Sequence, residues 1–143
     1  MRFPGRTYRE DRVWLAEIPI LEAMTQGRTR KEALEMVRDM IETMVGDEGF
    51  RADVFSGKGG DFEVGSDDPK PLVRILLQRK RELSGLSLAQ AAERLGASSK
   101  NAYARYERGT SVPTVAKFLE LLRAVSPDTD IVIQDSRRTA SKS

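Results

Sequence analysis

The amino-acid sequence predicts an α+β domain over residues 1–66, followed by an all-α domain over residues 72–135 that ends in a short strand. The first half contains several β-rich segments and one helical stripe, whereas the second half contains four helical patterns in succession. Between them, residues 65–71 read Gly-Ser-Asp-Asp-Pro-Lys-Pro, which is typical of a linker. We assign the linker itself to residues 67–71 and expect residues 136–143 to form a disordered tail.

The two halves carry opposite net charge, although the 143-residue chain as a whole has a formal net charge of +2. Residues 1–68 hold 10 Lys/Arg and 15 Asp/Glu, which gives a net charge of −5. Residues 69–143 hold 14 Lys/Arg and 7 Asp/Glu, which gives a net charge of +7. A basic half suits a polyanionic partner and an acidic half suits a basic one, but two small domains can also differ in charge by chance.

In the first domain, two strands are predicted before a helix. Val13–Ile18 is rich in β-favouring residues and ends at Pro19, and residues 2–9 are its predicted partner strand. Thr29 is a predicted N-cap, and Glu32 lies three residues further on, as in a capping box. The helix that follows ends at Gly46 and carries one apolar stripe, consisting of Ala33, Leu34, Val37, Met40, Ile41, Met44 and Val45.

Two further strands are predicted after this helix, at residues 50–55 and 61–64. The glycine-rich sequence between them, Ser56-Gly57-Lys58-Gly59-Gly60, is interpreted as a hairpin turn. A phosphate-binding loop is the weaker interpretation, because the G-x-x-x-x-G-K-[ST] spacing is missing and a strand follows instead of a helix.

Four helices are predicted in the second domain. They cover residues 72–83, residues 87–95 with Ser87 as the cap, a segment from near Ser98 to just before Gly109, and a segment from after Pro113 to about Val125. Pro127 ends the last helix, and Ile131-Val132-Ile133 is predicted to be the final strand.

The second and third of these helices have the pattern of a helix-turn-helix. Ala91 and Ala92 are small, so another helix can cross closely over them, and Gly96 permits a sharp turn. Ser98 or Ser99 can cap the next helix. The pattern therefore predicts two short helices packed at an angle to each other.

If Tyr103 and Tyr106 face inward, the third helix presents one outer stripe. Arg and Lys can hydrogen-bond guanine O6 and N7, Asn can bond adenine N6 and N7, and a small Ala allows contact with a thymine methyl group. The predicted base contacts are Lys100, Asn101, Ala104 and Arg105. The predicted phosphate contacts are Ser87, Ser99, Arg108, Thr110 and Ser111.

A solvated charged face on an ordinary helical bundle would show the same stripe. The small residues, the turn glycine and the cap spacing are accompanied here by Glu107-Arg108-Gly109 at the helix end and by Pro113 downstream. This combination favours DNA binding, and double-stranded operator DNA is the predicted partner.

Two family resemblances follow from these motifs. Residues 72–125 resemble the helix-turn-helix of the phage-repressor (Xre) class, and residues 98–107 resemble the HicB-type antitoxins in particular. The first half is also similar to the HicB pattern, in Trp14-Leu15-Ala16-Glu17-Ile18-Pro19, Thr25-Gln26-Gly27 and Glu32-Ala33-Leu34. The resemblance covers roughly residues 12–134.

The resemblance implies a partial RNase H-like βββαβ fold for the first half and the role of neutralising a small RNA-cleaving HicA-like toxin. Because such a toxin is expected to be basic, the acidic half would bind it through exposed carboxylates. The predicted toxin-binding residues are Glu22, Glu35, Asp39 and Glu42. The last three share one helix face, and the alternative is that they only keep the helix soluble.

A homodimer or higher homo-oligomer is expected, because a single recognition helix reads only a few base pairs. The predicted dimerisation residues are Ile131, Val132 and Ile133, since an isolated apolar strand is unstable. This segment would pair with its copy in a second chain or dock on the last helix of that chain.

The composition excludes several functions. The chain has no Cys and no His, so disulfides, thiolate chemistry and imidazole catalysis are absent. No motif joins the carboxylates Asp11, Glu17, Asp53 and Asp61, so no metal, cofactor or enzymatic activity is expected. No signal peptide or membrane-spanning run is visible, which predicts a cytoplasmic protein.

Two rival interpretations remain beside an antitoxin that represses its own operon. One is a stand-alone transcription regulator whose first domain senses a ligand or only oligomerises. The other is a residual nuclease.

Overall fold

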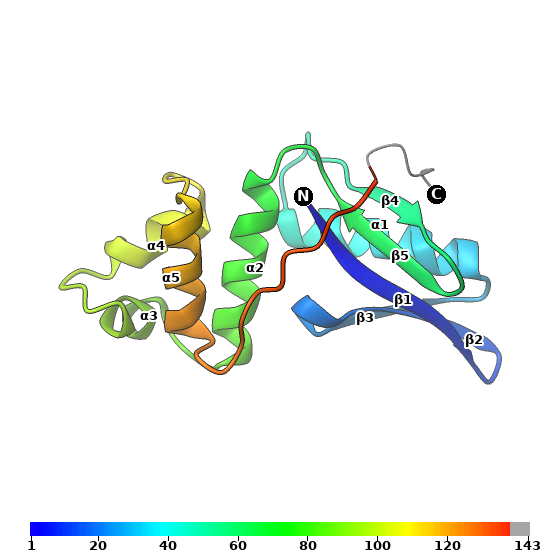
Figure 1. Ribbon diagram of the computed structural model, residues 1–143, viewed down its shortest axis with the longest axis horizontal. Coiled ribbons are helices and arrows are strands. Elements are labelled where there is room, and N and C mark those ends of the chain that lie inside the picture. Colours follow the sequence, from blue (N-terminus) through cyan, green and yellow to red (C-terminus); the bar gives the residue numbers. More distant parts are fainter. Residues whose placement is uncertain (138–143) are drawn as a thin grey trace. The chain divides into compact units, whose positions relative to one another are not determined.

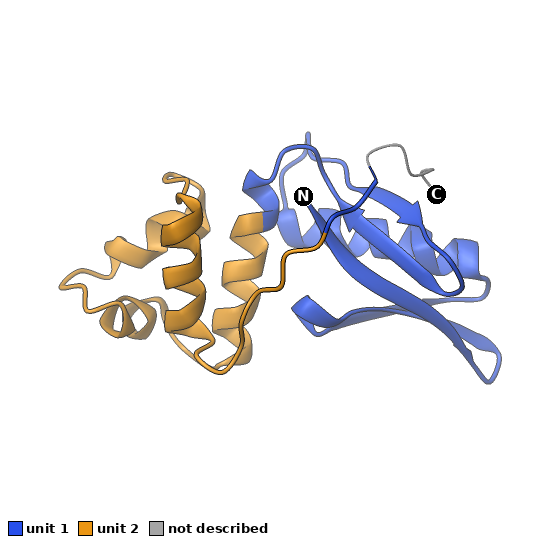
Figure 2. Cartoon of the chain, in the orientation of Figure 1, with its two compact units in different colours: residues 1–72, 135–143 blue, residues 73–134 orange. Residues whose placement is uncertain are grey.

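The computed structural model of the chain describes residues 1–137 (Figure 1). These residues form two compact units (Figure 2). Unit 1 contains residues 1–72 together with the segment that starts at residue 135, and unit 2 contains residues 73–134. The C-terminal segment therefore returns to the unit in which the chain begins.

Unit 1 is built on one five-stranded antiparallel sheet with the strand order β3-β2-β1-β5-β4. The central strand β1 pairs with β2, where Arg6 lies opposite Glu17, and with β5, where Arg6 lies opposite Asp61. The strands are β1 (Arg2–Glu10), β2 (Val13–Ile18), β3 (Ala23–Gly27), β4 (Asp53–Ser56) and β5 (Asp61–Gly65).

Helix α1 (Arg30–Val45) packs on one face of this sheet. Its buried residues are Ala33, Leu34, Val37, Ile41 and Val45, which confirms the predicted stripe apart from the methionines. Met40 and Met44 are only half-buried, and Met36 is exposed. Side chains alternate across a strand, so β1 sends Phe3 and Thr7 into the core and Arg6 to the other side.

The ends of α1 follow the sequence prediction. Thr29 Oγ1 accepts a hydrogen bond from the Glu32 N–H at 3.1 Å, which is the first half of the predicted capping box. Gly46 ends the helix with a φ of 74°, a left-handed conformation that glycine adopts without steric cost.

The predicted hairpins of unit 1 are confirmed. Strand β2 has the predicted bounds, and β1 reaches it through a two-residue turn in which Asp11 has a φ of 56°. Residues 57–60 form the turn between β4 and β5, where the Gly57 N–H donates to the Asp61 carbonyl at 2.8 Å. The glycine-rich segment is therefore a hairpin turn, as the sequence predicted.

One strand was not predicted from the residues. The order of strands and helix along the chain also differs from the order that the HicB resemblance implies. Strand β3 follows a short 3-10 turn, η1 (Pro19–Leu21), and its five residues are too few and too polar for a periodic signal. Two strands follow α1, whereas the βββαβ order has one. The expected βββαβ order is therefore wrong, and unit 1 is a mixed α/β unit with the order βββαββ.

The four helices predicted for the second domain are all present. They are α2 (Lys70–Leu83), α3 (Leu88–Arg94), α4 (Asn101–Arg108) and α5 (Val115–Val125). The core of unit 2 is apolar and includes Ile75, Leu76, Leu77, Leu121, Leu122 and Val125. Among the residues that the structure describes, no helix is both long and apolar enough to cross a membrane.

The predicted C-terminal strand does not form. In the described chain, residues 131–133 have no regular secondary structure, and the Val132 and Ile133 side chains are each 87% exposed. A strand needs a partner for its backbone groups, and the described part of unit 2 contains none. Pairing of this segment with a second copy of the chain stays a prediction.

Ser136 and Arg137 lie against β1 and β5 of unit 1. Arg2 Nη1 donates to Glu63 Oε1 at 3.0 Å, to Ser136 Oγ at 2.9 Å and to the Arg137 carbonyl at 3.1 Å. The Arg2 guanidinium also lies 3.6 Å from the centroid of the Phe55 ring. Of the expected tail, 136–143, residues 138–143 lie outside the part of the chain that is described.

The contact between β3 and α1 gives a test of the fold. A Cβ atom at Gly27 would lie 2.4 Å from the backbone nitrogen of Ala33, which cannot rotate away. We expect Gly27→Ala to lower the free energy of unfolding by roughly 1–3 kcal/mol, as overpacking does. Gly49→Ala is the control, because a Cβ there meets no atom within 4 Å. Equal urea midpoints for the two variants would contradict this packing.

Candidate nucleic-acid interface

Helix α3 begins with a complete capping box. Ser87 Oγ accepts from the Gln90 N–H at 3.1 Å, and Gln90 Oε1 accepts from the Ser87 N–H at 2.8 Å. Ala91 and Ala92 are buried, and α3 is in contact with α4. The predicted close approach of the two helices over small residues is therefore present.

The turn between α3 and α4 depends on Gly96, which has a φ of 76°. The Gly96 N–H donates to the Glu93 carbonyl at 2.9 Å and the Ala97 N–H to the Ala92 carbonyl at 3.1 Å, so the last turn of α3 is closed. At the start of α4, Ser99 Oγ accepts from the Asn101 N–H at 3.2 Å. Ser99 thus supplies the capping bond, although the N-cap position is Lys100.

Helix α4 has one buried and one exposed face. Tyr103 and Tyr106 are buried, as predicted. The exposed face carries Lys100, Asn101, Arg105 and Arg108. Three of these four side chains are cationic, so the face suits a polyanion.

Ala104 does not belong to this exposed face. It was predicted to contact a base, but its side chain is fully buried beside Tyr103. The outer stripe assigned from the sequence was one position too wide, because α4 packs a broader face against the rest of unit 2 than two tyrosines require. Ala104 is therefore a core residue that cannot reach a thymine methyl group.

The Arg105 guanidinium lies over the aromatic ring of Tyr106. Its Nη2 atom donates to the Tyr106 hydroxyl at 3.3 Å, and the guanidinium carbon lies 5.0 Å from the centroid of that ring. A side chain fixed in this way loses less conformational entropy when it binds a base edge.

The residues predicted to contact phosphates differ in exposure and in whether their hydroxyl proton is free to donate a hydrogen bond. The Ser87 and Ser99 hydroxyls accept capping bonds, which leaves their protons free to donate to a phosphate oxygen. Thr110 Oγ1 instead donates to the Arg105 carbonyl at 3.1 Å, so its proton is already used. Arg108 is exposed and Ser111 is half-buried.

Sequence reasoning missed Arg94, an exposed cation in the last turn of α3.

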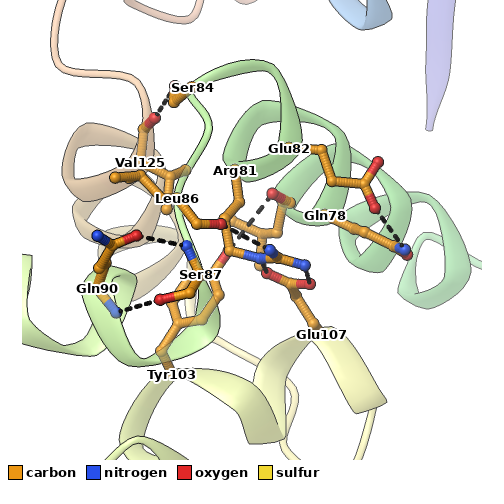
Figure 3. A network of polar contacts seen from close by, with 11 residues as sticks. Gln78, Arg81, Glu82, Ser84, Leu86, Ser87, Gln90, Tyr103, Glu107 and Val125 are labelled. Carbon is orange, nitrogen blue, oxygen red and sulfur yellow. Dashed lines mark hydrogen bonds and ion pairs between the residues drawn. The ribbon is translucent and has the colours of Figure 1, made fainter.

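A partly buried ion pair joins α2 to α4 (Figure 3). Arg81 Nε and Nη2 donate to the two carboxylate oxygens of Glu107 at 2.7 and 3.0 Å. Arg81 Nη1 donates to the Leu86 carbonyl at 2.8 Å. The two side chains are 15% and 7% exposed, so water screens the pair only weakly. A single guanidinium thereby connects α2, the segment before α3, and α4.

The ion pair also affects the protonation of its neighbourhood. Hydrogen bonding to Glu107 raises the pKa of Arg81, so this side chain stays charged. Burial raises the pKa of Tyr103, and the adjacent Glu107 carboxylate raises it further. The Tyr103 hydroxyl donates to the Leu77 carbonyl at 3.4 Å and therefore keeps its proton.

The sequence model of the helix-turn-helix family matches residues 77–125, which run from within α2 to the end of α5. These residues form a DNA-binding helix-turn-helix domain of the kind found in transcription regulators. A comparison of the chain with curated proteins gives no match.

The carboxylates predicted to bind a toxin lie in unit 1. Glu35 and Asp39 are exposed on α1. Glu42 is only half-exposed, and its Oε2 atom accepts from the Ala52 N–H at 2.9 Å, so it also holds the segment before β4. Glu22 is exposed after η1 with a φ of 46°.

The carboxylates considered for a metal site do not come together. Glu17 pairs with Arg6 across β1 and β2. Within residues 1–137, no group of three or more acidic side chains is arranged to hold a metal ion.

Base recognition can be tested on α4. We expect alanine substitution of Lys100, Asn101 or Arg105 each to weaken specific DNA binding by ~1–3 kcal/mol, the cost of a lost base contact. Arg108→Ala is expected to weaken specific and random DNA alike and to flatten the salt dependence. Operator titrations at two salt concentrations measure both effects. Unchanged affinity in all three base-facing variants would refute the assignment.

The ion pair can be tested by comparing removal of one partner with replacement of both partners by apolar side chains. We expect Glu107→Gln to destabilise unit 2 by roughly 1–3 kcal/mol, because it leaves the partly buried Arg81 charge without its partner. The double variant Arg81→Met/Glu107→Leu is expected to recover part of this loss. Thermal unfolding monitored by circular dichroism gives the comparison. A double variant less stable than Glu107→Gln would contradict the argument.

Proposed function

We propose that this protein is the antitoxin of a type II toxin–antitoxin pair. In this proposal, unit 1 binds and blocks a small basic RNA-cleaving toxin of the HicA type. Unit 2 binds operator DNA and represses the operon that encodes both proteins. The proposed partners are thus a duplex polyanion for one unit and a cationic protein for the other.

The observation that carries the proposal is an excess of exposed cations at one helix and of exposed carboxylates at another. Helix α4 and its N-cap expose the cations Lys100, Arg105 and Arg108, whereas α1 exposes three carboxylates, Glu32, Glu35 and Asp39, and one cation, Lys31. Among the residues described, neither Glu35 nor Asp39 forms an ion pair. Unpaired carboxylates on a helix face can be neutralised by a partner at a low desolvation cost, and they accelerate encounter with a basic protein.

A shallow cavity of about 320 Å³ lies at the C-terminal end of this helix face. Its lining contains four carboxylates, one cation and one aromatic side chain, and consists of Asp39, Glu42, Thr43, Gly46, Asp47, Glu48, Phe50 and Arg51. Such a lining can receive a Lys or Arg side chain, with carboxylates for the charge and Phe50 for the aliphatic stem. The HicB-like residues of β2, β3 and α1 support the same assignment.

Because the proposal assigns toxin binding to unit 1 and operator binding to unit 2, it predicts that substitutions can abolish one activity and leave the other. We expect Glu35→Lys/Asp39→Lys to abolish rescue of growth when the full chain is co-expressed with the toxin from the neighbouring gene, because like charges then face each other. The same variant is expected to repress an operator reporter normally. The variant Lys100→Ala/Arg105→Ala is expected to show the opposite behaviour, with rescue retained and repression lost.

The control Glu10→Lys/Asp67→Lys changes the net charge equally at two exposed positions outside both surfaces. It is expected to keep both activities. Repression without any toxin binding by the wild-type chain would refute the antitoxin role and favour a stand-alone regulator. Toxin rescue that survives reversal at Glu35 and Asp39 would place the toxin-binding surface elsewhere.

A further inference from the structure

The cations of unit 1 are gathered at one end of its sheet, although residues 1–68 are acidic as a whole. Of the ten Lys/Arg in residues 1–68, six lie in or beside the β1–β2 turn, at the start of α1 or in the β4–β5 turn. We call these six residues the basic end of unit 1, and they are Arg9, Arg12, Arg28, Arg30, Lys31 and Lys58.

Hydrogen bonds to β1 bring the three segments of the basic end together. The Thr7 N–H donates to the Gly60 carbonyl at 2.7 Å, which places the β4–β5 turn beside the last residues of β1. Arg30 Nε donates to Thr7 Oγ1 at 3.2 Å, so the start of α1 also lies beside this part of β1. Figure 1 accordingly shows the start of α1 and the two turns at the same end of unit 1.

Most of the cations at the basic end have no partner. Arg30 is half-buried and bonded to Thr7, whereas the other five are exposed. Within residues 1–137, the side chains of these five form no hydrogen bond and no ion pair. Elsewhere on the sheet, Arg2 pairs with Glu63 and Arg6 pairs with Glu17. The basic end is therefore the part of the sheet where positive charge is left without a partner.

Four carboxylates belong to the same segments, namely Glu10, Asp11, Glu32 and Asp61. Arg9 alternates with Phe3 and Thr7 along β1, so it lies on the side of the sheet that α1 covers. Glu10 lies on the other side, and so does Asp61, which is opposite Arg6 in the sheet. At most Asp11 and Glu32 can therefore offset the cations that share the helix side of the sheet with Arg9.

The charges around α1 are arranged against the helix dipole. Carboxylates stabilise the start of a helix and cations stabilise its end. In α1 the start has Arg28, Arg30 and Lys31 against one carboxylate, Glu32, and the last turn has no cation. This arrangement does not stabilise the free helix. A polyanion bound at the start of α1 would neutralise the cations and interact favourably with the dipole.

An aromatic side chain adjoins these cations. Trp14 lies directly opposite Arg9 in the β1–β2 pair, on the same side of the sheet, and is only half-buried. Single-stranded nucleic acids bind where cations follow the phosphates and an aromatic ring stacks on a base. In a duplex the bases are already stacked on each other, so a ring beside the backbone finds no free base.

We infer that the basic end of unit 1 binds single-stranded nucleic acid, with its phosphates at the exposed cations and a base against Trp14. This binding involves neither α4 nor the carboxylates Glu35 and Asp39. It therefore stands or falls separately from operator binding by unit 2 and from the antitoxin role.

The fluorescence of Trp14 gives a local measurement of this binding, because it is the only tryptophan in the chain. The full chain carrying Lys100→Ala/Arg105→Ala, which weakens binding at α4, is titrated with a short single-stranded RNA of random sequence. Saturable quenching of Trp14 is expected, since a stacked base lies in contact with the ring. A DNA duplex of equal length and polyglutamate are expected to quench far less at equal concentration of charge.

Substitution of two exposed cations tests the assignment of the phosphate contacts. Arg9→Gln/Arg28→Gln is expected to raise the Kd for the RNA by roughly tenfold or more at low salt. It is also expected to reduce the slope of log K against log salt by about 1.4, which is two contacts at about 0.7 each. Arg9→Lys/Arg28→Lys keeps both charges and is expected to retain most of the affinity. Lys70→Gln/Arg123→Gln is the matched control, because it removes the same charge at two exposed positions elsewhere.

Several outcomes would overturn the inference. The first is RNA that leaves Trp14 fluorescence unchanged, and the second is an equal loss of affinity in the Arg9/Arg28 variant and in the matched control. Quenching by the duplex as strong as that by the single strand would refute the single-stranded partner. Equal quenching by polyglutamate would instead indicate an acidic protein as the partner.

Discussion

The partly buried pair between Arg81 and Glu107 is the constraint on which the geometry of unit 2 depends. Helix α4 has only eight residues, and α3 has seven, so neither is long enough to be stable in water by itself. Arg81 ties α4 to α2 through two hydrogen bonds and ties the start of α3 through the Leu86 carbonyl. The helix-turn-helix is thereby held to a longer helix from a separate part of the sequence.

A buried pair of this kind contributes orientation more than stability, because removing two charges from water offsets much of their attraction. The bidentate geometry restricts the rotation of α4 about its axis, and in the structure Tyr103 and Ala104 face inward. The same rotation sets Lys100, Asn101, Arg105 and Arg108 outside. The side chains predicted to contact DNA are therefore positioned by an interaction on the opposite side of the helix.

Unit 1 uses its charges differently. Arg6 and Glu17 pair across neighbouring strands, and Arg2 bonds Glu63 and the C-terminal segment, so much of the charge on the sheet is satisfied internally. The exposed carboxylates of α1 are not used in this way. Because unit 1 contains both ends of the described chain, unit 2 is an insertion between two of its segments.

The sequence by itself determined most of the helices, the β1–β2 and β4–β5 hairpins and the helix-turn-helix, since these depend on local signals such as caps, glycine turns and apolar spacing. It also identified the exposed cations of α4. Only the tertiary structure decided that β3 completes the sheet, that Ala104 is buried, that the Thr110 proton is already bonded, and that residues 131–133 lack a strand partner. Each of these features depends on contacts between residues distant in sequence or on the rotation of a helix about its axis. Long-range contacts and helix rotation are not encoded in a short stretch of residues.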